Sequence, residues 1–61
     1  MMKAEELKNL REQAGLSRSE AARLIGVADR TWQRWENGEK TLPDGVTELF
    51  QRRLRERYDA T

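Results

Sequence analysis

The sequence predicts an all-α fold, a compact domain of four helices, or five if a short turn follows the last one. Two observations favour this fold class. Apolar residues recur at spacings of three and four, as on one face of a helix, and no segment alternates with the period of two that is typical of a strand. Glycines and the single proline divide the chain into segments of helical length. With 61 residues, we expect one domain that spans residues 1–61.

The first expected helix lies in KAEELKNLREQAG. Leu7, Leu10 and Ala14 form its apolar stripe, because residues three and four apart share a helix face. Gly15 suits the position just after the last turn, since glycine readily adopts the left-handed backbone conformation found there.

The second expected helix lies in SRSEAARLIG and opens with the pattern of a capping box. In this pattern the side chains of Ser17 and Glu20 each bond the other residue's backbone N–H. The next helical pattern begins about three residues after Gly26, so a tight turn is expected to join the two helices.

The third expected helix lies in GVADRTWQRWENG, which holds both tryptophans of the chain. Trp32 and Trp35 lie about 60° apart on a helix that turns about 100° per residue, so they define one face. Two roles are open for this face, stacking on nucleic-acid bases or forming the core. We expect the core, because so short a chain cannot leave in water two side chains that would each bury about 150–250 Å².

The fourth expected helix, at about residues 43–58, starts near Pro43 and Asp44, which both suit a helix N-terminus. Its apolar stripe consists of Val46, Leu49, Phe50 and Leu54. The RRLRER run in this helix favours a solvated, salt-bridged face over a basic patch for nucleic acid, because arginine and glutamate are mixed beside the apolar stripe. We expect the apolar side to contribute to a dimer interface as well as to the core.

The chain contains no cysteine and no histidine. Disulfides, thiolate metal ligands and the usual general base are therefore excluded, and we expect no enzymatic activity, no cofactor, no metal and no small-molecule ligand. The net charge is only +1, but nine of the twelve cations are arginines, whose planar fork suits phosphates and guanine edges. There is no apolar run of membrane-spanning length and no signal peptide, so we expect a cytoplasmic protein without membrane contact.

The middle of the chain resembles the helix-turn-helix of the phage-repressor-like, or Xre, family of transcriptional regulators. The resemblance covers roughly residues 5–43 and rests on LREQAGLS, AARLIGV and RWENG in that order. It implies a lambda-repressor-like domain with its helix-turn-helix at about residues 17–37. The expected core positions are Leu10, Ala22, Ile25, Val27, Trp32 and Trp35.

The resemblance also implies docking in the major groove of DNA, with the third helix as the recognition helix and the second lying across it. The base-reading positions of the family match Asp29, Arg30, Gln33 and Arg34, and the phosphate-contacting positions match Ser17, Arg18 and Asn37. Arg11 and Glu36 match a mostly buried ion pair that joins the first helix to the third.

The chain departs from the family pattern in four ways. Ala28 replaces the usual serine or threonine cap of the third helix, so Asp29 either takes over the cap or contacts a cytosine. Ala21 and Trp32 replace aliphatic residues, and we hypothesise that the small and the bulky side chain compensate in volume. Glu39 stands where relatives often carry a cation, which weakens the phosphate clamp. The frequent fifth helix of the family is not part of the predicted pattern.

The function predicted from these residues is that of a sequence-specific regulator of transcription that binds double-stranded DNA. We expect a repressor that binds a palindromic operator as a homodimer, as compact regulators of phages and other mobile elements do. The alternative is a protein-interaction module, antitoxin-like or an adaptor, that uses the same fold to meet an acidic protein.

Overall fold

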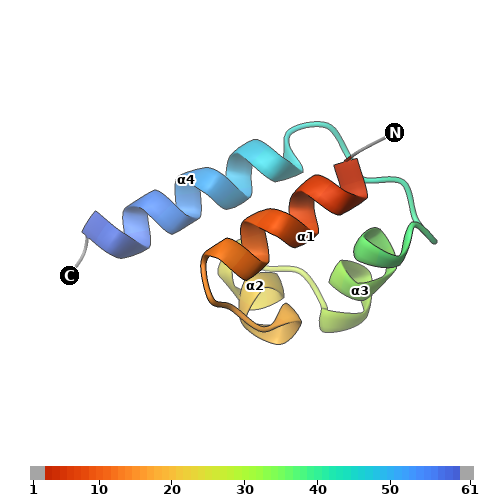
Figure 1. The fold of residues 1–61 in the computed structure, drawn as a ribbon, viewed down its shortest axis with the longest axis horizontal. Helices are drawn as coiled ribbons and strands as arrows, with labels where there is room; N and C mark the ends of the chain where they lie inside the picture. The colour runs from red at the N-terminus through yellow and green to blue at the C-terminus, as the bar shows by residue number, and fades with distance from the viewer. Residues whose placement is uncertain (1–2, 60–61) are drawn as a thin grey trace.

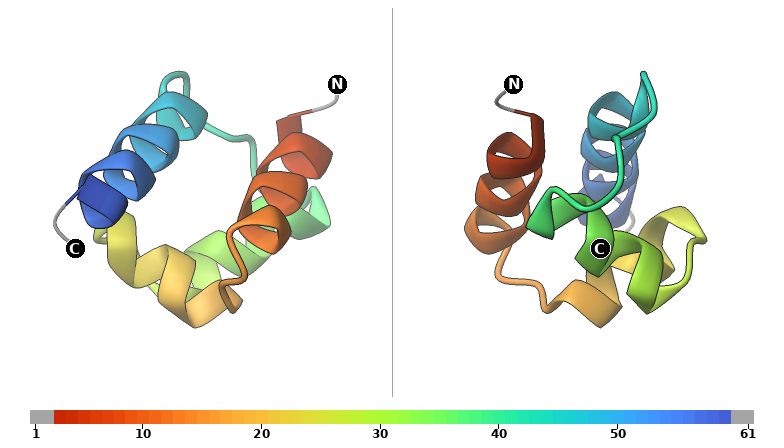
Figure 2. Two further views of the ribbon diagram at one scale, coloured as in Figure 1. Left: turned by 60° about the vertical axis from the view of Figure 1, so that its left-hand side comes forward. Right: turned by 90° about the vertical axis from the view of Figure 1, so that its right-hand side faces the viewer.

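Within residues 3–59, four α-helices make up the fold, as the sequence predicted. A computed structural model describes residues 3–59 and shows α1 (Lys3–Gln13), α2 (Arg18–Ile25), α3 (Asp29–Asn37) and α4 (Val46–Asp59). Figure 1 shows α1 and the longer α4 running in the same direction, and Figure 2 shows α2 and α3 closing one side of the space between them. The expected all-α class is thus confirmed, while a fifth turn after α4 would fall outside the described residues.

The predicted capping box begins α2. Ser17 has an extended backbone, its hydroxyl oxygen accepts the N–H of Glu20 at 3.1 Å, and the Glu20 carboxylate accepts the N–H of Ser17 at 2.8 Å. These two bonds satisfy backbone donors that an uncapped helix start would leave open, so the direction in which α2 leaves the loop is fixed.

Left-handed glycines end the two central helices. Gly26 has φ +75° and closes α2, and Gly38 has φ +77° and closes α3, each donating its N–H back to the last turn. A side chain at Gly26 would meet no atom within 4 Å, so backbone conformation and not crowding selects glycine there. The turn at Gly26 sets the angle at which α3 follows α2.

The fourth helix begins later than the sequence indicated. It starts at Val46 and not near Pro43, because Gly45 has φ +88° and so cannot belong to a right-handed helix. Pro43 to Gly45 form a turn, in which the N–H of Val46 donates to the carbonyl of Pro43 at 3.3 Å.

The core lies where all four helices meet. Its buried side chains are Leu7, Leu16, Ala21, Ala22, Trp32, Trp35, Leu42 and Phe50. Trp32 has no exposed surface and meets Trp35 and Phe50 edge to face, with ring centroids 6.2 and 5.0 Å away. Of the expected core positions, Ala22 and both tryptophans are buried, and the other three pack against the cluster while half-buried; these are Leu10, Ile25 and Val27.

Within residues 3–59, no helix is long and apolar enough to cross a membrane.

Candidate nucleic-acid interface

Helix α3 has one buried and one exposed side. Trp32 and Trp35 fix its inner side in the core. The outer side carries the exposed side chains of Asp29, Arg30, Gln33, Arg34 and Asn37. Because the inner side is held by two large rings, the outer side is presented at a fixed angle to any partner.

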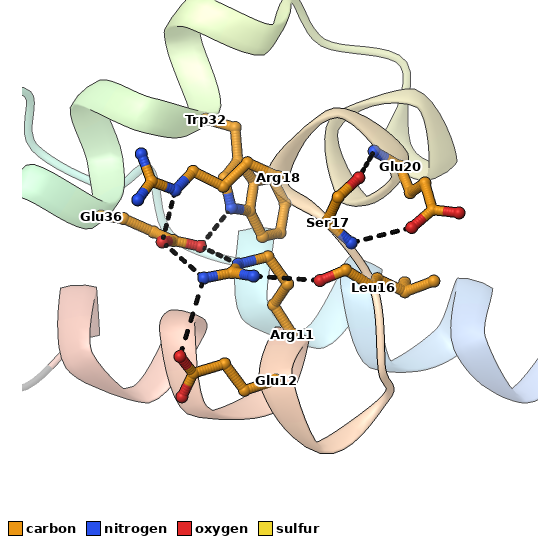
Figure 3. Close-up of polar contacts among 8 residues, drawn as sticks. All are labelled: Arg11, Glu12, Leu16, Ser17, Arg18, Glu20, Trp32 and Glu36. Atoms are coloured by element: carbon orange, nitrogen blue, oxygen red, sulfur yellow. Dashed lines mark hydrogen bonds and ion pairs between the residues drawn. The ribbon is translucent and has the colours of Figure 1, made fainter.

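A buried carboxylate anchors α3 to α1. The side chain of Glu36 is 3% exposed and accepts two bonds from Arg11, from Nε at 2.6 Å and from Nη2 at 3.2 Å. The indole Nε1 of Trp32 donates to the same carboxylate, as Figure 3 shows. A carboxylate so far removed from water needs this full set of donors, so the cluster ties α3 to α1.

Arg11 remains charged in this cluster. Its hydrogen bonds to Glu36 raise the pKa of the guanidinium, against the lowering effect of burial. Its Nη1 also donates to the carbonyl of Leu16 at 3.0 Å, just before α2 begins (Figure 3). One side chain therefore connects α1, the loop before α2 and α3.

Arg18, a predicted phosphate contact, lies close to the same carboxylate. Its Nε is 3.6 Å from Oε1 of Glu36, and its side chain is 47% exposed (Figure 3). It occupies the first turn of α2, beside the capping residue Ser17, where helix N–H groups favour an anion. Arg18 can therefore reach a phosphate at this end of α2 while Glu36 limits its orientation.

Asp29 is held by a residue that the sequence did not single out. Ser19 Oγ donates to Oδ2 of Asp29 at 2.7 Å, which joins α2 to the start of α3. The capping position of α3 is Ala28, which has no side-chain cap bond. Within residues 3–59, the Asp29 carboxylate therefore bonds a serine of α2 and does not cap the first turn of α3.

Asn37 and Glu39 contact each other just beyond α3. Asn37 Nδ2 donates to Oε2 of Glu39 at 3.4 Å, and both side chains are exposed. A phosphate approaching Asn37 would meet the carboxylate of Glu39 as well. The predicted weakening of the phosphate clamp by Glu39 thus has a structural basis, while the contact with DNA stays a prediction.

The comparisons with known proteins agree with this geometry. A family model described as a helix-turn-helix domain matches residues 4–61. The chain belongs to this helix-turn-helix family. Over 58 residues, 95% of its length, it is also 34% identical to the type II methyltransferase M.MspI of Moraxella sp. The chain spans only 14% of the length of that relative. No solved structure matches the chain.

In this helix-turn-helix domain, a turn at Gly26 joins α2 to α3. Such a domain indicates DNA as the partner. Across the part of the chain that the structure describes, no group of three or more acidic residues is placed to hold a metal ion.

Sequence spacing did not reveal Ser19 as part of the site, because its partner lies ten residues away across the turn. The sequence did show that Ser19 carries a hydroxyl in the first turn of α2, and that α3 begins only a few residues after α2 ends.

Proposed function

We propose that this chain binds double-stranded DNA in a sequence-specific manner, with α3 in the major groove, and that it regulates transcription as a repressor. The observation that carries the proposal is the outer side of α3. Arg30, Gln33 and Arg34 are exposed on a helix whose inner side is locked in the core. A rigid helix with outward polar side chains is what a major groove can accept.

The chemistry of the exposed residues suits base edges. Arg30 and Arg34 each carry a planar fork of donors that matches the O6 and N7 acceptors of guanine. Gln33, between them in sequence, matches the donor and acceptor of adenine. Phosphate contacts from Ser17, Arg18 and the N-terminus of α2 would fix the register of the domain on the duplex.

The proposal extends to the mode of binding. In accordance with the resemblance to the Xre family, the domain acts in the cytoplasm as a homodimer on a palindromic operator. The half-sites then lie one helical turn apart, about 34 Å. Because the net charge is only +1, each subunit neutralises few phosphates and binds weakly alone. We also propose that the chain is not an enzyme, and we therefore do not assign to it the methyltransferase activity in the name of its relative.

The test is a selection of bound duplexes from a random pool, followed by fluorescence anisotropy on the selected duplex. We expect affinity that falls steeply with salt and a loss of about fivefold to 150-fold in Arg34→Ala, the range for one bidentate base contact. Arg55→Ala is the matched control, since Arg55 is an exposed arginine on α4 and should change affinity little.

A pool that yields no enriched sequence at low salt would overturn the proposal. If the purified chain then captured an acidic protein in a pull-down, the result would favour the alternative function, that of a protein-interaction module.

A further inference from the structure

The hydrogen bond between Ser19 and Asp29 has a chemical consequence for what α3 can read. Ser19 Oγ is the donor and Asp29 Oδ2 the acceptor, at 2.7 Å. The hydroxyl hydrogen of Ser19 is therefore engaged, and the ionised carboxylate of Asp29 has no hydrogen to offer. The pair presents only acceptors to a ligand, and Asp29 is exposed.

We infer that Asp29, oriented by Ser19, accepts a hydrogen bond from the amino group of a cytosine, so that each half-site contains a required C·G pair at this position. The inference rests on the proposed function, since it concerns the same docking of α3. It identifies Asp29 as a specificity-determining residue and Ser19 as the residue that positions it.

The base edges in the major groove support this assignment. Guanine presents the acceptors N7 and O6, and thymine presents the acceptor O4 and a methyl group, so both would place an acceptor against the carboxylate. Adenine has an amino donor but also the N7 acceptor beside it. Cytosine presents its N4 amino donor alone. An acceptor-only pair therefore discriminates against guanine and thymine by repulsion, fits adenine less well because of the N7 acceptor, and favours cytosine by attraction.

The charge of the surface points the same way. Asp29 is a carboxylate at the start of a helix that must approach a polyanion, and its neighbours on the outer side include Arg30 and Arg34. Near phosphates, the negative charge of a carboxylate that accepts no bond from the DNA lowers affinity for every sequence. Where a base donates a hydrogen bond to Asp29, this loss of affinity is offset. The chain then binds duplexes with that base more tightly than other duplexes.

A purely structural role for Asp29 makes a different prediction. An acid in the first turn of α3 also stabilises the helix through its dipole, by about 0.3–1 kcal/mol at an exposed site. That role would change the stability of the domain but not its choice of base. Base preference is therefore the readout that separates the two roles.

The experiment uses the duplex enriched from the random pool. In anisotropy titrations, the wild-type chain is measured against variants of that duplex with each base pair at the position next to Asp29, and with N4-methylcytosine there. N4-methylcytosine pairs normally but turns a methyl group toward the groove in place of the amino hydrogen. We expect the wild-type chain to prefer cytosine by about fivefold to 150-fold, and N4-methylcytosine to remove this preference.

Two variants and one control complete the design. Asp29→Asn and Ser19→Ala should lose the preference at this single position and retain it elsewhere in the site. Glu39→Gln removes one negative charge from the same surface and should raise affinity for all duplexes alike, with the cytosine preference intact.

If the wild-type chain discriminates at other positions while Asp29→Asn changes none of its preferences, the inference is overturned and the proposed function stands. If the wild-type chain discriminates at no position, the proposed function itself fails, and the inference fails with it.

Discussion

Replacing Glu36 by alanine removes the acceptor that holds α3 against α1. The change leaves the guanidinium of Arg11, whose side chain is 11% exposed, without its two bonds to the carboxylate. It also removes the acceptor of the Trp32 indole N–H in the middle of the core. Both groups would then be far from water and without their main partner.

The size of the effect follows from this burial. Removing one partner of a buried ion pair destabilises a protein by about 3–5 kcal/mol. Arg11 keeps its bond to the carbonyl of Leu16 and lies 4.0 Å from Glu12, so we expect the lower end, about 3 kcal/mol. A chain of this length has a free energy of unfolding of roughly 3–9 kcal/mol, so a third or more of the total is lost.

Urea unfolding followed by tryptophan emission measures this directly, because both tryptophans are buried and report on the packing of α3. Glu12→Ala is the matched control on α1, and it should change the free energy of unfolding by no more than about 0.5 kcal/mol, since Glu12 is exposed. The double variant Arg11→Met with Glu36→Leu should recover much of the loss, because neither partner is then left as an unpaired buried charge.

A loss below about 1 kcal/mol in Glu36→Ala would show that this cluster does not anchor α3 against α1.

Three further changes test the local structure. Ala28→Ser should stabilise the domain by about 1 kcal/mol in urea unfolding, because α3 starts without a side-chain cap; an unchanged midpoint would show that the extended geometry there does not admit the bond. Trp32→Val should lose about 3 kcal/mol, and adding Ala21→Leu should restore part of it if the two volumes compensate; the compensation hypothesis fails if the single variant loses no stability. The hydrogen bond from the backbone N–H of Ser17, and after it the Ser17 hydroxyl, lowers the pKa of Glu20 from its ordinary 4.5. The stabilisation of the fold by the Glu20 carboxylate is therefore complete above pH 4.5 and is lost as pH falls through the lower pKa of the folded state. Glu20→Gln should therefore flatten the decline of the unfolding midpoint below about pH 4.5, and an unaltered acid limb would contradict this.

Local signals in the sequence were sufficient to predict the four helices and most of their ends. The capping box at Ser17 and the glycines at 26 and 38 act within a few residues, so their effects could be derived without the fold. The start of α4 could not be predicted in this way. Pro43 by itself suits a helix start, and only the left-handed conformation of Gly45 moves the start to Val46.

Interactions across the fold were predicted less completely. Leu16 and Leu42 are buried but lie in loops, where helical periodicity gives no signal. The pair of Arg11 and Glu36 was expected only through the family resemblance, and the indole N–H of Trp32 as a third partner was not foreseen. Distances between helices decide such contacts, and these come from the packing of the whole core.

Contact between the outer side of α3 and DNA can be followed through the backbone amide resonances of the chain while the selected duplex is added. We predict that the largest shifts fall on α3 from Asp29 to Asn37 and on the first turn of α2, with Arg34→Ala removing them at equal duplex concentration. Shifts concentrated on α1 or α4, with α3 unchanged, would show that α3 is not the surface that contacts DNA.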